Sequence, residues 1–227
     1  MSEDEGKICA IKKRSKLNYI IPIGIEPAPI DLNNQSYLRK KLKIDEKNFL
    51  IGYIGRIHQK KNIDSLIKAF ILLNKEIKQS ISIVIIGPGN SKYKKYISEL
   101  VDSVDGDNIF LFDQIPHKKA IQCMSELDLY SLPSYTENFG MAITEALSVG
   151  TPVLISKHVN ISKMVKKYNA GIIVKTDPKS ISIAIKKLIN KPATLESMKT
   201  NAKTLVRNKY SWDKIIIDYL NMYNKEA

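Results

Sequence analysis

The feature that most constrains the fold is a regular alternation of short apolar runs with longer amphipathic runs between residues 49 and 189. The short runs have the length of β-strands, and the longer runs carry apolar residues at helical spacing. Strands that alternate with helices in this way predict a parallel sheet that is covered by helices on both faces. We therefore expect an α/β fold in which a single domain contains a parallel six-stranded sheet.

The expected elements can be placed along the chain. Strands are predicted at 49–54, 81–86, 109–112, 128–132, 152–155 and 171–174. Helices are predicted at 62–78, 93–104, 118–127, 141–149, 160–168, 180–189 and, without further strands, within 192–225. Pro192 suits the start of a helix, and Ser211 suits the cap of the last helix. The chain is thus divided into a connecting segment (1–45), the α/β domain (46–191) and C-terminal helices (192–227).

Composition limits the classes of partner. The net charge of +13 is compatible with nucleic acid, with an anionic membrane surface or with an anionic small ligand, and also with solvated lysine-rich helix faces. Nucleic acid is disfavoured because the basic residues are spread over many helices and match no nucleic-acid-binding module. The N-terminus has no apolar signal segment, and Cys9 and Cys123 form no disulfide framework. We expect a cytoplasmic protein, with peripheral contact at the inner membrane face left open.

Two segments carry residues suited to binding a phosphorylated ligand. In the first, Gly55 ends a predicted strand and Arg56 and Lys61 follow in one loop, where two cations can hold a diphosphate. In the second, Glu137 to Glu145 runs from a loop into a predicted helix that opens at Gly140. A helix N-terminus binds anions through its free N–H groups. Taken alone, the first segment is also explained as a basic surface loop. Taken alone, the second is also explained by glutamates that interact favourably with the N-terminal end of the helix dipole.

The histidines give no comparable signal. His58, His117 and His158 show no spacing to a carboxylate or cysteine that indicates a catalytic or metal site. We expect them to be structural or surface residues, and we expect no metal site.

The segments together resemble a known family. Residues 49–156 are similar to the donor-binding domain of the retaining glycosyltransferase family 4, which has the GT-B fold. The similar pieces occur in order, namely Gly55-Arg56 with Lys61, Ile85-Ile-Gly-Pro-Gly89, Glu137-Asn-Phe-Gly140 through Glu145-Ala146, and Gly150-Thr-Pro-Val153. The resemblance implies a Rossmann-like domain that forms the C-terminal half of a GT-B enzyme.

The resemblance also implies roles for the residues. Arg56 and Lys61 would bind the donor diphosphate and stabilise the leaving nucleotide without a metal cofactor, and Glu137 would face the sugar. The remaining positions expected at the donor are Gly55, Ile115 at the nucleobase, Asn138, Phe139 and Gly140 at the phosphates, and Glu145 at the ribose. The donor would be a UDP-, GDP- or ADP-sugar. The acceptor would be a glycan or a lipid-linked molecule.

The resemblance has one main departure. The family has two domains, and residues 1–45 correspond only to the end of the first domain and to the interdomain hinge, so the acceptor domain is not represented. Three interpretations stay open: a transferase that works with a separate acceptor-domain chain, a module that only binds sugar nucleotides, and, less favoured, a sugar-nucleotide epimerase of the same fold. The apolar C-terminal helix and the apolar residues near the start of the chain predict self-association, a partner chain or disorder at both ends.

Overall fold

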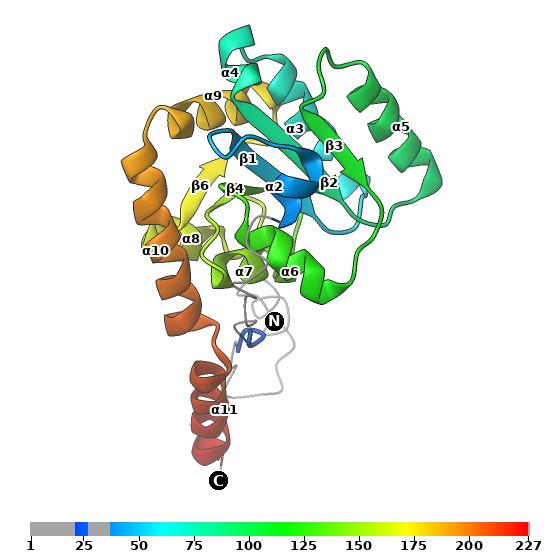
Figure 1. Cartoon of the computed structure of the whole chain (residues 1–227). Helices are drawn as coiled ribbons and strands as arrows, with labels where there is room; N and C mark the ends of the chain where they lie inside the picture. Colours follow the sequence, from blue (N-terminus) through cyan, green and yellow to red (C-terminus); the bar gives the residue numbers. More distant parts are fainter. Residues whose placement is uncertain (1–20, 27–36, 227) are drawn as a thin grey trace.

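The computed structural model of the chain describes residues 21–26 and 37–226. Six strands form one sheet in the order β3-β2-β1-β4-β5-β6 (Figure 1). The strands are β1 (Phe49–Ile54), β2 (Ile81–Ile86), β3 (Ile109–Phe112), β4 (Leu129–Leu132), β5 (Val153–Ser156) and β6 (Gly171–Val174). Every neighbouring pair is parallel. The predicted fold class and the place of each predicted strand are confirmed.

Helices lie on both sides of the sheet (Figure 1). They are α2 (Tyr37–Leu42), α3 (Ile63–Ile71), α4 (Lys75–Gln79), α5 (Ser91–Asp102), α6 (His117–Ser125), α7 (Met141–Ser148), α8 (Ser162–Tyr168), α9 (Pro178–Ile189), α10 (Pro192–Lys209) and α11 (Trp212–Glu226), with a short 3-10 turn η2 (Gln59–Lys61). Helix α3 packs against α5 and α9 on one side. Helix α7 packs against α6 and α10 on the other.

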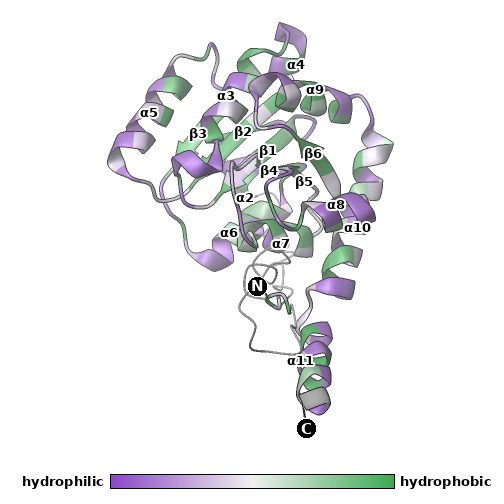
Figure 2. Ribbon diagram, turned by 180° about the vertical axis from the view of Figure 1, so that it is seen from behind, coloured by the Kyte–Doolittle hydropathy of each residue, from purple (hydrophilic) through white to green (hydrophobic). Residues whose placement is uncertain are grey.

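The central strands are apolar because both of their faces are covered. All residues of β2 are buried, including Ser82, and Figure 2 shows hydrophobic strands inside helices whose outer faces are hydrophilic. A strand that is buried on both faces reads as a continuous apolar run rather than as an alternation. The Ile-rich run at 81–86 therefore indicates that β2 lies inside the sheet and not at its edge.

Two elements differ from the prediction. The helix expected at 62–78 is divided into α3 and α4, because Asn74 caps a new helix by accepting a hydrogen bond from Ile77 N (3.4 Å). The segment expected to be a connection up to residue 45 contains α2. Long-range contacts hold α2 in place: the Glu126 carboxylate accepts from Leu38 N (2.8 Å), and Arg39 pairs with Asp128 (2.8 Å).

The C-terminal helices follow the prediction. Helix α10 begins at Pro192, and the Ser211 hydroxyl accepts from Lys214 N (3.4 Å) at the start of α11. Ile25 N donates to Tyr210 O (2.6 Å), so the hinge-like segment meets the chain between these helices. Of the segment expected to form the end of the first domain and the interdomain hinge, residues 1–20 and 27–36 lie outside the described residues. Within the described ranges, no helix combines the length and the apolarity that are needed to cross a membrane.

Candidate active site

The sheet has one topological switch point, between β1 and β4. Strands β2 and β3 lie on one side of β1, whereas β4, β5 and β6 lie on the other. Parallel sheets of this kind bind ligands outside the carboxyl ends of the strands at the switch point. A cavity of about 370 Å³ opens there. Its lining comes from the ends of β1 and β4 and from the start of α7: Tyr53, Gly55, Arg56, Lys61, Tyr130, Leu132, Glu137, Phe139, Gly140, Met141 and Ala142.

Glycines bring the ends of β1 and β2 close together beside this cavity. Gly55 N donates to Ile86 O (2.9 Å), and a Cβ atom on Gly87 would lie 1.9 Å from Gly55 O. No side chain fits at Gly87, so the Gly87-Pro-Gly89 segment serves as a strand-to-helix turn with close backbone approach. Arg56 leaves β1 at this point and lies at the cavity.

Two buried tyrosines form part of the cavity lining and fix the backbone that carries Arg56. The Tyr53 hydroxyl donates to Arg56 O (2.6 Å), and the Tyr130 hydroxyl donates to Ile54 O (2.9 Å). Their rings are stacked with centroids 6.5 Å apart. Burial raises the pKa of both phenols above the ordinary value, so both remain protonated donors. The sequence does not reveal the role of these tyrosines, because an aromatic residue in an apolar run is indistinguishable from ordinary core.

Lys61 and Glu137 form an ion pair inside the cavity. Their side chains are 20% and 17% exposed, so the pair is largely shielded from solvent. Glu137 is held by the backbone, because its N–H donates to His158 O (3.2 Å) and its carbonyl accepts from Asn160 N (3.1 Å). The structure therefore joins two residues that were predicted separately from loops 76 residues apart. Arg56 forms no ion pair among the described residues.

Asn62 connects this loop to two other strand ends. It is fully buried with left-handed backbone angles (φ 59°, ψ 39°). Its amide nitrogen donates to Pro133 O (3.0 Å) after β4 and to Thr176 O (2.8 Å) after β6. The sequence pattern places Asn62 at the end of the basic loop and at the start of a helix but does not indicate this buried role. Its tolerance of left-handed angles is the signal that could have pointed to it.

The start of α7 closes the other side of the cavity. Gly140 has φ +75°, and no side chain caps the helix, so its first N–H groups have no side-chain acceptor at the cap. Phe139 and Gly140 line the cavity, and the Phe139 ring packs edge-to-face on Tyr210 with centroids 5.6 Å apart. Asn138 lies in the same loop but not in the cavity lining. The predicted helix start is confirmed, and it faces Arg56 and Lys61 across the cavity.

Glu145 lies one turn further along α7 and outside the cavity lining. Its carboxylate Oε1 is 2.9 Å from Nε2 of His117, the first residue of α6. His117 is a surface residue, as expected, because its side chain is 75% exposed, but it has a carboxylate partner that the sequence spacing does not indicate. The two residues are 28 positions apart, and only the packing of α6 against α7 brings them together.

His58 has a local role, because its Nδ1 accepts from Lys60 N (3.1 Å).

Ile115 lies at a second cavity, next to the first along the same sheet edge. This cavity measures about 160 Å³ and lies between α2, α6 and the ends of β2 and β3. Ile115 and Pro116 line it, and the next residue is His117, which contacts Glu145. The predicted site residues thus form a row that runs from the switch point to the end of β3.

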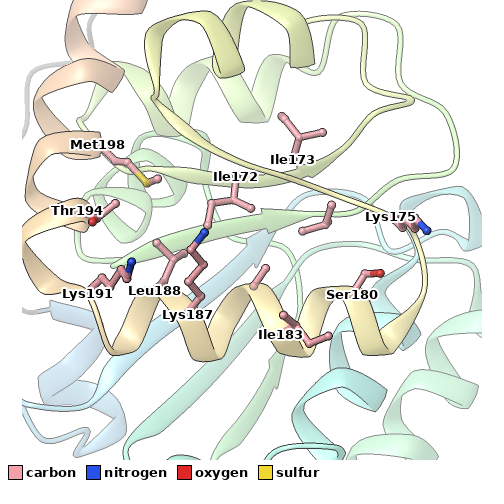
Figure 3. Close-up of a pocket in the computed structure, with 12 residues that line it drawn as sticks. Ile172, Ile173, Lys175, Ser180, Ile183, Lys187, Leu188, Lys191, Thr194 and Met198 are labelled. Atoms are coloured by element: carbon pink, nitrogen blue, oxygen red, sulfur yellow. The ribbon is translucent and has the colours of Figure 1, made fainter.

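A third hollow lies elsewhere on the domain. A groove of about 480 Å³ lies between the edge strand β6 and helices α9 and α10. Figure 3 shows apolar side chains such as Ile172 and Leu188 in it, together with Lys187 and Lys191. None of the predicted site residues lines this groove.

In residues 21–26 and 37–226, no three His, Cys, Asp or Glu side chains gather as metal ligands. Ligand binding without a metal stays a prediction.

Comparison with known families identifies the domain. Residues 34–205 match the family model described as glycosyl transferases group 1. The chain belongs to this family. The match spans both sheet halves and every predicted site residue, so the glycosyl transferases group 1 assignment covers the whole candidate site.

The chain is also similar to individual members of the group. It is 29% identical over 203 residues to the capsular polysaccharide biosynthesis glycosyltransferase CapM of Staphylococcus aureus, covering 88% of this chain and 52% of that protein. It is 29% identical over 206 residues to the lipopolysaccharide 1,2-N-acetylglucosaminetransferase of Salmonella typhimurium, covering 86% and 53%. The chain thus spans about half the length of these relatives.

Solved structures share the fold. Sucrose-phosphate synthase from Thermosynechococcus elongatus superposes with a TM-score of 0.82 at 20% identity, over 99% of this chain and 57% of that one. Anabaena HepE, in complex with UDP and glucose, gives a TM-score of 0.80 at 18% identity, over 99% and 61%. The C-terminal domain of a group 1 protein from Francisella tularensis gives 0.71 at 22% identity, over 83% of this chain and all of that one.

Proposed function

We propose that this domain binds a nucleotide diphosphate sugar and supplies the donor half of a retaining glycosyltransferase of family 4. The observation that carries the proposal is the cavity at the switch point, where Arg56, Lys61 and the start of α7 meet. Two cations and a row of backbone N–H groups form a site for two adjacent phosphates. Glu137 in the same cavity is placed to accept hydrogen bonds from sugar hydroxyls.

The proposed reaction needs little more than positioning and charge stabilisation. The bond from the anomeric carbon to the β-phosphate oxygen breaks, a bond to an acceptor hydroxyl oxygen forms, and the hydroxyl proton is released. The nucleoside diphosphate gains negative charge as it leaves. Arg56, Lys61 and the α7 amides would stabilise that charge in the manner of an oxyanion hole. Glu145, one turn into α7, would bind the ribose hydroxyls, with His117 beside it.

The relatives support the class of substrates. The names of two relatives refer to capsular polysaccharide and to lipopolysaccharide, and HepE has been solved with UDP-glucose. We infer a glycan or a lipid-linked acceptor and a cytoplasmic site of action. Peripheral contact with an anionic inner membrane is consistent with the net charge of +13.

Calorimetry tests the proposal directly. The folded chain is titrated with UDP, GDP and ADP in a buffer that contains EDTA. We expect binding of at least one diphosphate with a Kd between about 1 μM and 1 mM, which corresponds to about 8 to 4 kcal/mol. A folded sample that releases no heat with any of the three would overturn the proposal.

A second candidate function is a module that binds the donor without catalysis. It rests on the same cavity, whose described lining supplies groups for the donor phosphates. Incubation with a UDP-sugar distinguishes the two functions. Slow donor hydrolysis, or transfer after addition of a chain that carries an acceptor domain, supports a transferase. Binding without either product supports the module, and a changed sugar on the intact nucleotide indicates an epimerase.

A further inference from the structure

The cavity at Ile115 holds an unusual concentration of positive charge. Lys119 Nζ lies 4.5 Å from the centroid of the Tyr37 ring, and Lys41 Nζ lies 5.8 Å from the same centroid. Lys41 Nζ also lies 5.6 Å from the centroid of the Phe112 ring. The two ammonium groups therefore gather around one phenol at the mouth of the cavity.

Among the residues that the structure describes, neither Lys41 nor Lys119 forms an ion pair with a carboxylate. The hydrogen bond with Lys119 holds the pKa of the Tyr37 hydroxyl below its ordinary value. Two neighbouring cations without an anion are electrostatically unfavourable, and a ligand that offers electron-rich acceptors relieves this cost.

The walls of the cavity suit a planar ring. Tyr37 and Phe112 contribute aromatic rings that each have an ammonium group near one face, and Ile86 and Ile115 contribute apolar surface. Bases pack favourably against aromatic side chains. The polar groups at the rim are mostly donors: the two ammonium groups, the Tyr37 hydroxyl and the amide nitrogen of Gln114.

The position of the cavity matches that of a nucleobase in the proposed donor site. Glu145, the proposed ribose partner, contacts His117, and Pro116 and Ile115 lead directly into the cavity. Two extended residues span about 7 Å, which is the scale of the step from a ribose to its base. The diphosphate site, the Glu145–His117 pair and this cavity therefore follow the order of the parts of a nucleoside diphosphate.

We propose that Lys41, Lys119 and Tyr37 select the base of the donor and favour uracil over adenine. The proposal rests on the proposed function. Uracil offers two carbonyl oxygens to a rim of donors, whereas adenine accepts only through ring nitrogens and carries an exocyclic amino group, a donor, that would face the ammonium groups. Sites that hydrogen-bond a particular group discriminate strongly against analogues that lack it.

The test compares the affinities of UDP, ADP and inorganic pyrophosphate by calorimetry in the full chain and in variants. We expect UDP to bind about tenfold or more tightly than ADP. In the double variant Lys41→Ala with Lys119→Ala, UDP should weaken about tenfold, while the affinities of ADP and pyrophosphate stay within about twofold. The control is Lys118→Ala, which removes a neighbouring exposed lysine that does not line the cavity. Thermal unfolding of each variant checks that the fold is intact.

The outcomes separate the two proposals. Equal binding of UDP and ADP, or an equal loss for both in the double variant, overturns base selection and leaves the proposed function standing. A loss of pyrophosphate binding in the double variant also overturns it, because the lysines would then act on the phosphates. Absence of binding by all three ligands overturns the proposed function and the base selection with it.

Discussion

Lys61 has one anionic partner in the structure and a second one in the proposed function. In the structure it pairs with Glu137, and in the proposed function it also meets the donor diphosphate. Both side chains are largely shielded, so the lysine is held where it can bridge a carboxylate and a phosphate. A charge-assisted hydrogen bond contributes about 1.5–3 kcal/mol. The contribution of Lys61 should therefore appear only with ligands that carry phosphate.

We expect Lys61→Ala to weaken UDP binding about tenfold or more, with little effect on uridine, because each 1.4 kcal/mol is about tenfold. Calorimetry with both ligands measures the difference. Lys60→Ala is the matched control, since Lys60 is the exposed neighbour in the same loop. Equal losses for UDP and uridine in Lys61→Ala would show that the lysine does not contact phosphate.

Tyr53 and Tyr130 donate to neighbouring carbonyls but should differ in their effects. The Tyr53 hydroxyl holds Arg56 O at the cavity, whereas the Tyr130 hydroxyl holds Ile54 O in the buried strand. We expect Tyr130→Phe to lower the free energy of unfolding by about 1–3 kcal/mol, because a buried acceptor loses its partner. Tyr53→Phe should instead weaken UDP binding a few-fold with a smaller loss of stability. Urea unfolding measures the loss of stability in both variants, and calorimetry measures the loss of UDP affinity. A larger loss of stability in Tyr53→Phe than in Tyr130→Phe would contradict the assignment.

Cys123 should react slowly with thiol reagents. Burial raises the pKa of its thiol to about 11, and the thiolate is the reactive form. At pH 8 only about a thousandth of the thiol is then ionised. In a Cys9→Ser background, we expect a disulfide reagent to modify Cys123 at least about a hundredfold faster in urea than in buffer, with the rate in buffer rising as the pH approaches 11. Equal rates in urea and in buffer would show an accessible thiol.

At the residue scale, the sequence predicts the charged side chains of the site but not their partners. Arg56, Lys61 and Glu137 follow strands, and the carboxyl ends of parallel strands meet at one edge, so their convergence is predictable. The pairing of His117 with Glu145 depends on how α6 lies against α7, which no local pattern encodes. The roles of Tyr53 and Tyr130 depend on hydroxyl directions within the core.

At the scale of elements, the strands were predictable and the breaks between helices were not. Strands such as β2 are buried on both faces and produce unambiguous apolar runs. Helical periodicity continues through residues 72–74, so the boundary between α3 and α4 depends on the cap at Asn74. Helix α2 is held by Glu126 and Asp128, which lie almost ninety residues away. Such tertiary contacts override local propensity.

Asn62 is the residue that most clearly joins elements. Its side chain ties the loop after β1 to the ends of β4 and β6, and its backbone is left-handed. We expect Asn62→Ala to cost about 2–5 kcal/mol, because two carbonyls lose a donor and alanine resists this conformation. Asn62→Gly should cost less by about 1 kcal/mol, since glycine adopts left-handed angles freely. Urea unfolding measures both values, and an equal cost would show that backbone strain contributes nothing.

At the scale of the whole molecule, the most distinctive feature is α11. Figures 1 and 2 show it extending away from the body of the domain as an isolated helix with hydrophobic residues along it. Ile215 is buried, whereas five other apolar or aromatic side chains that share one helical stripe are 40–63% exposed: Trp212, Ile216, Tyr219, Leu220 and Tyr223. An apolar stripe at this spacing is typical of a helix that packs against another surface.

The stripe predicts association in solution, because soluble proteins rarely leave a contiguous apolar patch of more than a few hundred Å² in water. We expect the chain to form dimers or larger species at micromolar concentration, as measured by light scattering, and Ile216→Lys with Leu220→Lys to shift it to monomer. Ile217→Lys is the matched control: Ile217 is as exposed as Ile216 but lies off the stripe, so this variant should still associate. A chain that stays monomeric at every concentration, with residues 210–226 resistant to protease, would contradict the prediction, because the helix would then have folded back onto its own domain.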